Sequence, residues 1–199
     1  QNPDLVKPAL GPKEPWAYRN KMQMPVGGTK GDIQMGFYAM GSHDIVQGTN
    51  CPIQDEGNNV IAQACYQIAK EFDIEPYDEH TGKGVLRHII GRIGQSGWMI
   101  ILVTATQQLP HKEKWVEKLT ERISQVETII HNVNGKRTNV ILGPKNNILY
   151  GNGTITDHIK DLQFTLSPHS FFQVNPEQTT VLYDQALAYA DLKGDETVI

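Results

Sequence analysis

The chain has 199 residues and a formal net charge of −4, with 39% hydrophobic and 20% charged residues. This composition excludes a wholly disordered, collagen-like or disulfide-scaffold protein. No run approaches the roughly 18 apolar residues of a membrane span, and no secretory signal pattern opens the chain. With two cysteines, Cys51 and Cys65, we expect a reduced, cytoplasmic protein without a membrane partner.

The charge is unevenly distributed along the chain. Residues 81–150 hold ten Lys and Arg against four Glu, a local charge of +6, whereas residues 51–80 carry −6. A basic block of this kind is either a solvated face or a surface that contacts a polyanion. The overall negative charge argues against a dedicated nucleic-acid binder.

The first third of the chain reads as an arm followed by short strands. Residues 1–14 are rich in proline and lack periodicity, which predicts a linker. Alternation then predicts strands over 18–25 and 33–40, joined by the glycine-rich turn 27–32, and a third strand over 43–46.

Helices and longer strands follow. Asp55 is a good N-cap for a helix to about residue 73, and its apolar stripe places Cys65 in the core. Two strong strands, 85–93 and 98–104, flank the hairpin signal Gly94-Gln95-Ser96-Gly97. The remaining expected elements are a helix from 112 with an apolar face reaching Val126, a strand over 128–133, and two or three short strands within 146–166.

The last segment resembles the opening of an α/β unit. Asn175 is a good N-cap, Pro176 suits the first helical position, and Gln178 would complete a capping-box-like pair. The helix should run to about 192, with a buried strand starting at Thr197-Val198-Ile199. We therefore predict an α+β central domain of antiparallel sheets with helices over 15–169, followed by a second unit over 170–199.

Common enzymatic signatures are missing: there is no Walker loop, HExxH, GxSxG, CxxC or GxGxxG. The seven histidines lack metal-ligand spacing, and each reads as a surface or internally satisfied residue.

Two segments stand out instead. In the loop before the last helix, Phe171 and Phe172 either fill the core or offer a stacking platform for a base, with Gln173 beside them. Arg19 and Lys21 share one face of the first strand and are either exposed charges or a contact surface. Arg87 and Arg92, five apart, need a bulge to form one patch.

Several short segments, in this order, carry a resemblance to a known family. They are Tyr18-Arg19-Asn20-Lys21, Ser42-His43-Asp44-Ile45-Val46, Asn50-Cys51-Pro52, Val85-Leu86-Arg87-His88 and Ser170-Phe171-Phe172-Gln173-Val174-Asn175. They resemble the RNA uracil-5-methyltransferases, in particular the bacterial 23S ribosomal RNA branch, over essentially the whole chain. The Phe-Phe-Gln-x-Asn segment before a helix is the most specific.

The resemblance implies a central α+β domain followed by a Rossmann-like, S-adenosylmethionine-binding methyltransferase domain. The target uridine is flipped out of the RNA, and a cysteine thiolate adds to C6 so that C5 can accept the methyl group. By the same resemblance, Gln173 would bind the cofactor or the flipped base, and Phe171, Arg19, Lys21 and Arg87 would bind the substrate. Cys51 would match the last of four ligands in members with a [4Fe–4S] cluster.

The sequence also departs from the family pattern. One thiolate cannot hold a [4Fe–4S] cluster, so none is expected in this chain. The cofactor loop, the nucleophilic cysteine and the general base would lie beyond residue 199, so we expect a fragment that neither transfers methyl groups nor binds S-adenosylmethionine tightly. We expect the intact protein to be a monomer acting on ribosomal RNA. The alternatives are a non-catalytic RNA-binding or assembly module and a small-molecule-binding α+β domain.

Overall fold

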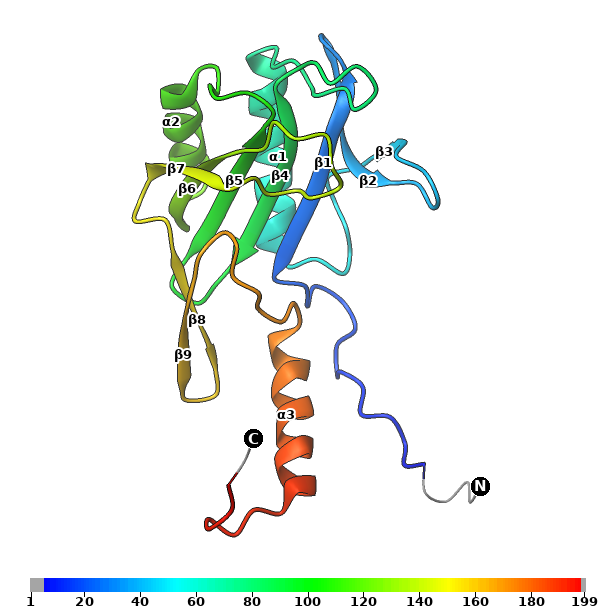
Figure 1. Cartoon of the computed structure of the whole chain (residues 1–199), viewed down its shortest axis with the longest axis vertical. Helices are drawn as coiled ribbons and strands as arrows, with labels where there is room; N and C mark the ends of the chain where they lie inside the picture. Colours follow the sequence, from blue (N-terminus) through cyan, green and yellow to red (C-terminus); the bar gives the residue numbers. More distant parts are fainter. Residues whose placement is uncertain (1–5, 198–199) are drawn as a thin grey trace.

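The computed structural model describes residues 6–197 (Figure 1). This part of the chain contains nine strands and three helices. In chain order they are β1 (Lys21–Thr29), β2 (Asp32–Tyr38), β3 (Ile45–Gln47), α1 (Glu56–Glu71), β4 (Leu86–Ile93), β5 (Trp98–Thr104), α2 (Lys112–Arg122), β6 (Val126–Val133), β7 (Lys145–Tyr150), β8 (Ile155–Ile159), β9 (Leu162–Leu166) and α3 (Pro176–Ala190).

Seven of the strands form one mixed sheet in the order β3-β2-β1-β4-β5-β6-β7, and β8 and β9 form a separate hairpin. All neighbouring pairs are antiparallel except β5 and β6, which are parallel. The prediction of purely antiparallel sheets is therefore wrong at this pair. Between the two strands the chain returns through α2, so β5 and β6 begin at the same end of the sheet and run in the same direction.

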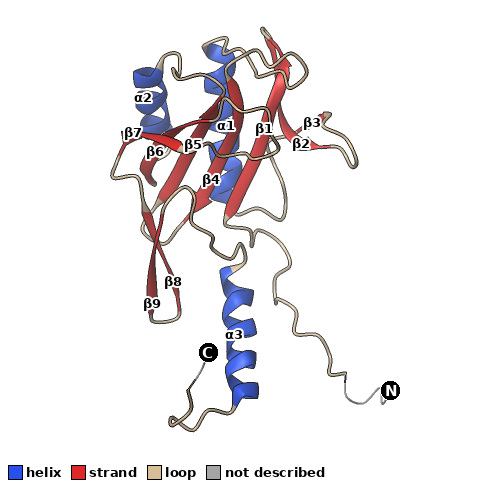
Figure 2. Cartoon of the chain, in the orientation of Figure 1, coloured by secondary structure: helices blue, strands red, loops and turns tan. Residues whose placement is uncertain are grey.

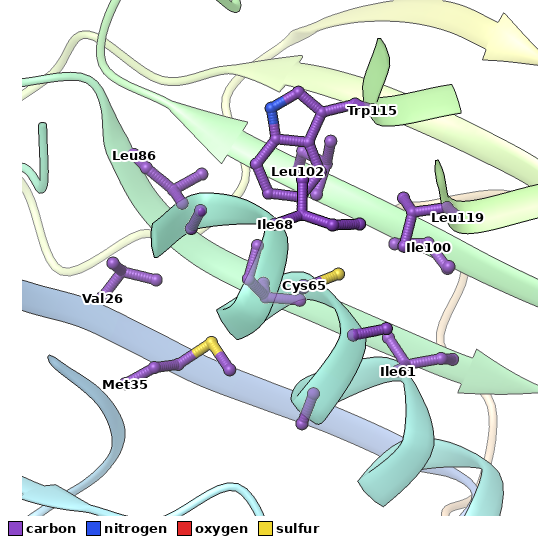
Figure 3. Close-up of a cluster of buried hydrophobic side chains, with 14 of the residues drawn as sticks. Val26, Met35, Ile61, Cys65, Ile68, Leu86, Ile100, Leu102, Trp115 and Leu119 are labelled. Carbon is purple, nitrogen blue, oxygen red and sulfur yellow. The ribbon is translucent and has the colours of Figure 1, made fainter. Parts of the chain in front are cut away.

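Both α1 and α2 pack on one face of the sheet (Figure 2). Ile61, Cys65 and Ile68 of α1 meet Ile100 and Leu102 of β5 in the core (Figure 3). Cys65 is fully buried, as predicted, and this burial raises the pKa of its thiol. The apolar stripe read from the sequence is thus the contact surface of α1.

Helix boundaries follow local chemistry. The Asp55 side chain accepts a hydrogen bond from the Gly57 N–H at 2.8 Å, which confirms it as the N-cap of α1. The second helix is shorter than predicted: it ends at Arg122, because Ile123 turns into an extended conformation (φ −132°, ψ 95°). Val126 therefore begins β6 instead of extending the helix.

The opposite face of the sheet has no helix but is partly covered. Ile90, Val103 and Ile130 form a second apolar cluster there, with Ile155 and Leu166 from the β8–β9 hairpin. The segment between β6 and β7 also crosses this face, in front of β4 (Figure 1). Because β4 is covered on both faces, its sequence is almost continuously buried.

The C-terminal helix α3 extends away from the sheet (Figure 2). Asn175 accepts a hydrogen bond from the Gln178 N–H at 3.0 Å, as expected for its N-cap. The Gln178 side chain donates to the Leu10 carbonyl at 2.6 Å instead of completing a capping box. Of the strand expected at the end of the chain, Val198 and Ile199 lie outside the described residues, as do residues 1–5 of the arm. In the described part, every helix is too short or too polar to cross a bilayer.

Candidate functional site

A cluster of cations lies where β1 begins and β4 ends. Lys21 is the direct cross-strand partner of Arg92, so both side chains are on the helix-free face. Lys21 is half-buried, and its side-chain ammonium has no hydrogen-bonding or ion-pair partner among residues 6–197. Burial, with Arg92 and then Arg19 nearby, lowers the Lys21 pKa from 10.5 to about 8. An uncompensated cation of this kind is suited to binding an anion.

Arg92 fixes the loop that precedes α3. Its side chain is 4% exposed. The guanidinium donates to the Ser167 carbonyl at 2.9 Å and also to the Ser170 carbonyl. The Ser167 N–H in turn donates to the Ser170 hydroxyl at 2.9 Å. The turn 167–170 is therefore anchored to the end of β4, so the chain reaches Phe171 beside Arg92, and Phe172 lines a hollow with Lys21 and Arg92.

The sequence left two roles open for the phenylalanines of this loop, filling the core or stacking on a base, and the two residues differ in their surroundings. Phe172 packs against the second apolar cluster, with its ring 5.7 Å from that of Phe164. Phe171 is 84% exposed, far more than a core aromatic. An exposed ring on an anchored loop is available to stack on a flat partner.

Gln173 lies in the same loop and is half-buried. Its backbone carbonyl accepts from the Asn20 side chain at 3.4 Å, and the Val174 carbonyl accepts from the Asn20 N–H at 3.0 Å. The Gln173 residue also lines a shallow hollow on α3 with Asn175 and Gln178. The structure therefore brings Gln173, Phe171 and Lys21 to one end of the sheet.

Arg19 and Arg87 differ from their predicted settings. Arg19 precedes β1 and donates through Nε to the Lys21 carbonyl at 3.1 Å, so it joins the cluster from outside the strand. Arg87 is 4% exposed and lies five residues from Arg92 along β4, about 16 Å at roughly 3.3 Å per residue. The structure does not bring it together with Arg19 and Lys21.

The Arg87 guanidinium is occupied by the segment between β6 and β7. It donates to the carbonyls of Asn134 at 2.7 Å, Lys136 at 2.8 Å and Thr138 at 3.4 Å. A register shift between Leu86 and His88 supplies the bulge that the sequence analysis required. Arg87 thus anchors a loop through its two terminal nitrogens, while its Nε is buried without a partner.

Cys51 lies in the loop before α1 and is half-buried. Its backbone N–H donates to the Asn59 side chain at 3.0 Å. The chain's other cysteine is in the core, and within residues 6–197 no three His, Cys, Asp or Glu side chains are grouped to hold a metal. The described residues therefore do not fit a four-thiolate iron–sulfur cluster.

One buried residue was missed by sequence reasoning. His88 is 6% exposed, so it is not a surface residue, one of the two alternatives that the sequence left for each histidine. Its ring forms no hydrogen bond with any described residue, and Nδ1 is buried without a partner. No local signal in the sequence distinguishes His88 from the other histidines.

Comparison with known proteins gives consistent results. No family model matches the chain. The chain is 46% identical over 196 residues to a Bacillus cereus protein, and 47% identical over 197 residues to an Oceanobacillus iheyensis protein, both named RNA methyltransferases. Each alignment covers 98% of the chain but 43% of the relative. The chain thus spans less than half the length of these curated relatives.

A solved structure shows the same fold. The Pyrococcus abyssi tRNA (uracil-54, C5)-methyltransferase, in complex with S-adenosyl-L-homocysteine, matches 88% of the chain with a TM-score of 0.71. The sequences are 21% identical, and the match covers 41% of that protein. Nearly the whole chain is therefore similar to a part of proteins named as RNA methyltransferases, and this part is less than half of the length of each of them.

Proposed function

We propose that the chain is part of an S-adenosylmethionine-dependent RNA uracil-5-methyltransferase whose target is a uridine of 23S ribosomal RNA. The observation that carries this proposal is the exposed Phe171 ring on a loop that Arg92 anchors at the end of β4, the end of the sheet where the Lys21 ammonium lies without a partner. A stacking surface beside a free cation suits a base and its phosphate. The similarity to named RNA methyltransferases along the chain supports the same conclusion.

Each site residue has a role in this proposal. Phe171 stacks on a base at the target position, and Lys21 and Arg19 contact phosphates. Gln173 contacts the cofactor or the flipped base. S-adenosylmethionine supplies the methyl group. Among the described residues, the resemblance matches only Gln173 to a position that contacts this cofactor. We assign no chemical step of the methyl transfer to the 199 residues.

Neither cysteine of the chain suits the covalent step. The Cys65 thiol is fully buried with a raised pKa, so it is rarely ionised. Cys51 is half-buried in a loop that pairs with Arg19, and the resemblance matches it to a cluster ligand and not to the nucleophile. We therefore propose that another part of the protein supplies the thiolate that adds to C6. The intact protein would act as a cytoplasmic monomer.

The test uses the product of the complete gene. It is incubated with S-adenosylmethionine carrying a labelled methyl group and with unmodified 23S ribosomal RNA or transfer RNA, and the digested nucleosides are identified by mass spectrometry. We expect 5-methyluridine in the 23S RNA, and less of it with Phe171→Ala. Label only in transfer RNA would overturn the ribosomal target. RNA binding without any methylation would favour the non-catalytic RNA-binding module. The 199-residue chain alone should show no turnover.

A further inference from the structure

A polar cavity lies on the helix-free face, away from the cation cluster. It has a volume of about 210 Å³, and Gly27, Gln34, Tyr38, Tyr77 and His88 are among its lining residues. His88 is the cross-strand partner of Pro25, four residues along β1 from Lys21. Because side chains alternate along a strand, Lys21, Pro25 and Gly27 share this face. The cavity and the cation cluster therefore lie on one face of the same two strands.

One wall of the cavity is a pair of stacked rings. The Tyr38 and His43 rings lie 4.9 Å apart at 19°. Glu79 holds both of them: the Tyr38 hydroxyl donates to one carboxylate oxygen at 3.4 Å, and His43 Nδ1 lies 2.5 Å from the other. Tyr38 is 39% exposed, so part of this flat surface is open. It resembles the aromatic platforms on which single-stranded bases stack.

Another wall is rigid. The Arg87 guanidinium lies 4.5 Å from the centre of the Tyr77 ring, and its hydrogen bonds to the 134–138 segment hold it there. Tyr77 itself is 7% exposed. The cavity is thus preformed between a fixed loop and the tip of β2.

Deeper groups offer neutral hydrogen bonding. Burial and then Arg87 lower the His88 pKa to about 4, so the ring is neutral at physiological pH, with one donor and one acceptor nitrogen. Neither nitrogen has a partner among residues 6–197. The half-buried Gln34 carboxamide also lines the cavity. A neutral donor–acceptor set complements the edge of a base better than it complements a phosphate.

The lining of the cavity contains three carboxylates, Asp44, Asp78 and Glu79, and one guanidinium, that of Arg87. Arg137 donates to the His80 carbonyl at 2.8 Å, which places this exposed cation beside the cavity's 77–80 wall. Of the nearby carboxylates, Asp78 is occupied by the His80 N–H and the Thr81 hydroxyl, each at 2.8 Å. Glu79 is occupied by Tyr38 and His43, and Asp44 is the remaining acid of the lining. Arg137 is the exposed cation next to this wall that is placed to contact a phosphate of an RNA chain.

We propose that this cavity binds one unpaired nucleotide of the RNA substrate, with its base stacked on Tyr38 and its edge hydrogen-bonded to His88 and Gln34. The inference rests on the proposed function, and the site is separate from the one at Phe171. With this second site, the helix-free face would contact the RNA at two separate points along one extended surface.

The test measures binding of fluorescein-labelled, eight-nucleotide oligouridylate and oligoadenylate to the 199-residue chain at low salt by fluorescence anisotropy. Tyr38→Ala should weaken binding of at least one of the two about tenfold, because a base–aromatic stack is lost. Tyr38→Phe keeps the ring and should stay within about twofold. Tyr150→Ala is the matched control, since Tyr150 is similarly exposed (43%) but lies on β7 at the far edge of the sheet.

Two further measurements separate the outcomes. Titration with uridine or adenosine monophosphate should shift the His88 ring nitrogen signals in ¹⁵N NMR spectra. Arg137→Gln should reduce the slope of log Kd against log salt by about one, whereas Lys114→Gln, on α2 behind the sheet, should not. Unchanged binding by Tyr38→Ala alongside weaker binding by Phe171→Ala would overturn the cavity and leave the proposed function standing. No binding of either oligonucleotide would also overturn it, while the methylation assay on the complete gene product decides the proposed function independently.

Discussion

Lys21 of β1 and Arg92 of β4 lie directly opposite each other in the sheet, with both cations on its helix-free face. The two have different tasks. Arg92 is buried, and its guanidinium donates hydrogen bonds to the carbonyls of Ser167 and Ser170. The ammonium of Lys21, in contrast, has no partner among the described residues. This cross-strand pair therefore joins a structural anchor to a free positive charge, and the first three predictions concern these two residues.

RNA affinity should depend on pH through Lys21. Its pKa is lowered to about 8, so its charge is lost within a range where an ordinary lysine stays protonated. We expect binding of oligouridylate to weaken as the pH rises through about 8. Lys21→Arg keeps the charge and should remove this dependence. Anisotropy titrations of both proteins on either side of that pH check it, and an identical pH profile for the two would contradict it.

The same group affects stability in the opposite sense. Because the folded pKa lies below the value of 10.5 for a free lysine, the unfolded state binds more protons between about pH 8 and 10.5. Through Lys21, stability should therefore rise with pH across this window. Lys21→Met should flatten this part of the profile, measured by urea denaturation at several pH values.

Removal of the anchor should destabilise the protein. Arg92→Ala leaves the Ser167 and Ser170 carbonyls without their charged donor, and we expect a loss of about 2–3 kcal/mol in the free energy of unfolding. Arg122→Ala, at the exposed end of α2, is the control and should have little effect. Equal unfolding midpoints for Arg92→Ala and the unmodified chain would show that the loop is held by other contacts.

The two adjacent phenylalanines should separate binding from stability. Phe172→Ala removes a ring from the second apolar cluster and should lower the free energy of unfolding by about 2 kcal/mol. Phe171→Ala should leave stability unchanged, because the ring is 84% exposed, but should weaken RNA binding. Urea denaturation and anisotropy on both variants make the comparison, which fails if Phe171→Ala is the less stable of the two.

Thiol labelling should distinguish the two cysteines. Cys65 is fully buried and its thiol has a raised pKa, so it should not react with Ellman's reagent in the folded protein. Cys51, half-buried in a loop, should react slowly. We expect one thiol to be titrated under native conditions and both in denaturant. Cys51→Ser should abolish the native reaction, and rapid labelling of that variant would show that α1 opens.

Much of the local structure could be predicted from the sequence. Of the turn predicted over 27–32, residues 27–29 instead extend β1, and only residues 30–31 join it to β2. The hairpin turn at 94–97, the N-caps Asp55 and Asn175, and the buried face containing Cys65 match the structure. Each depends on residues within a few positions of one another, where backbone propensity and side-chain periodicity suffice. The same local patterns could not show that α2 ends before Val126, because an extended backbone at Ile123 ends it.

The sequence by itself determined the elements and pointed to Phe171, Arg19 and Lys21. Only the tertiary structure decided what those residues face. Strand pairing placed Lys21 opposite Arg92, and tertiary contacts left Phe171 exposed, buried part of Phe172 and turned Arg87 inward to hold the 134–138 segment. It also left His88 buried without a partner. These outcomes depend on contacts between residues far apart in the chain, and side-chain order along a single strand carries no information about which strand lies beside it.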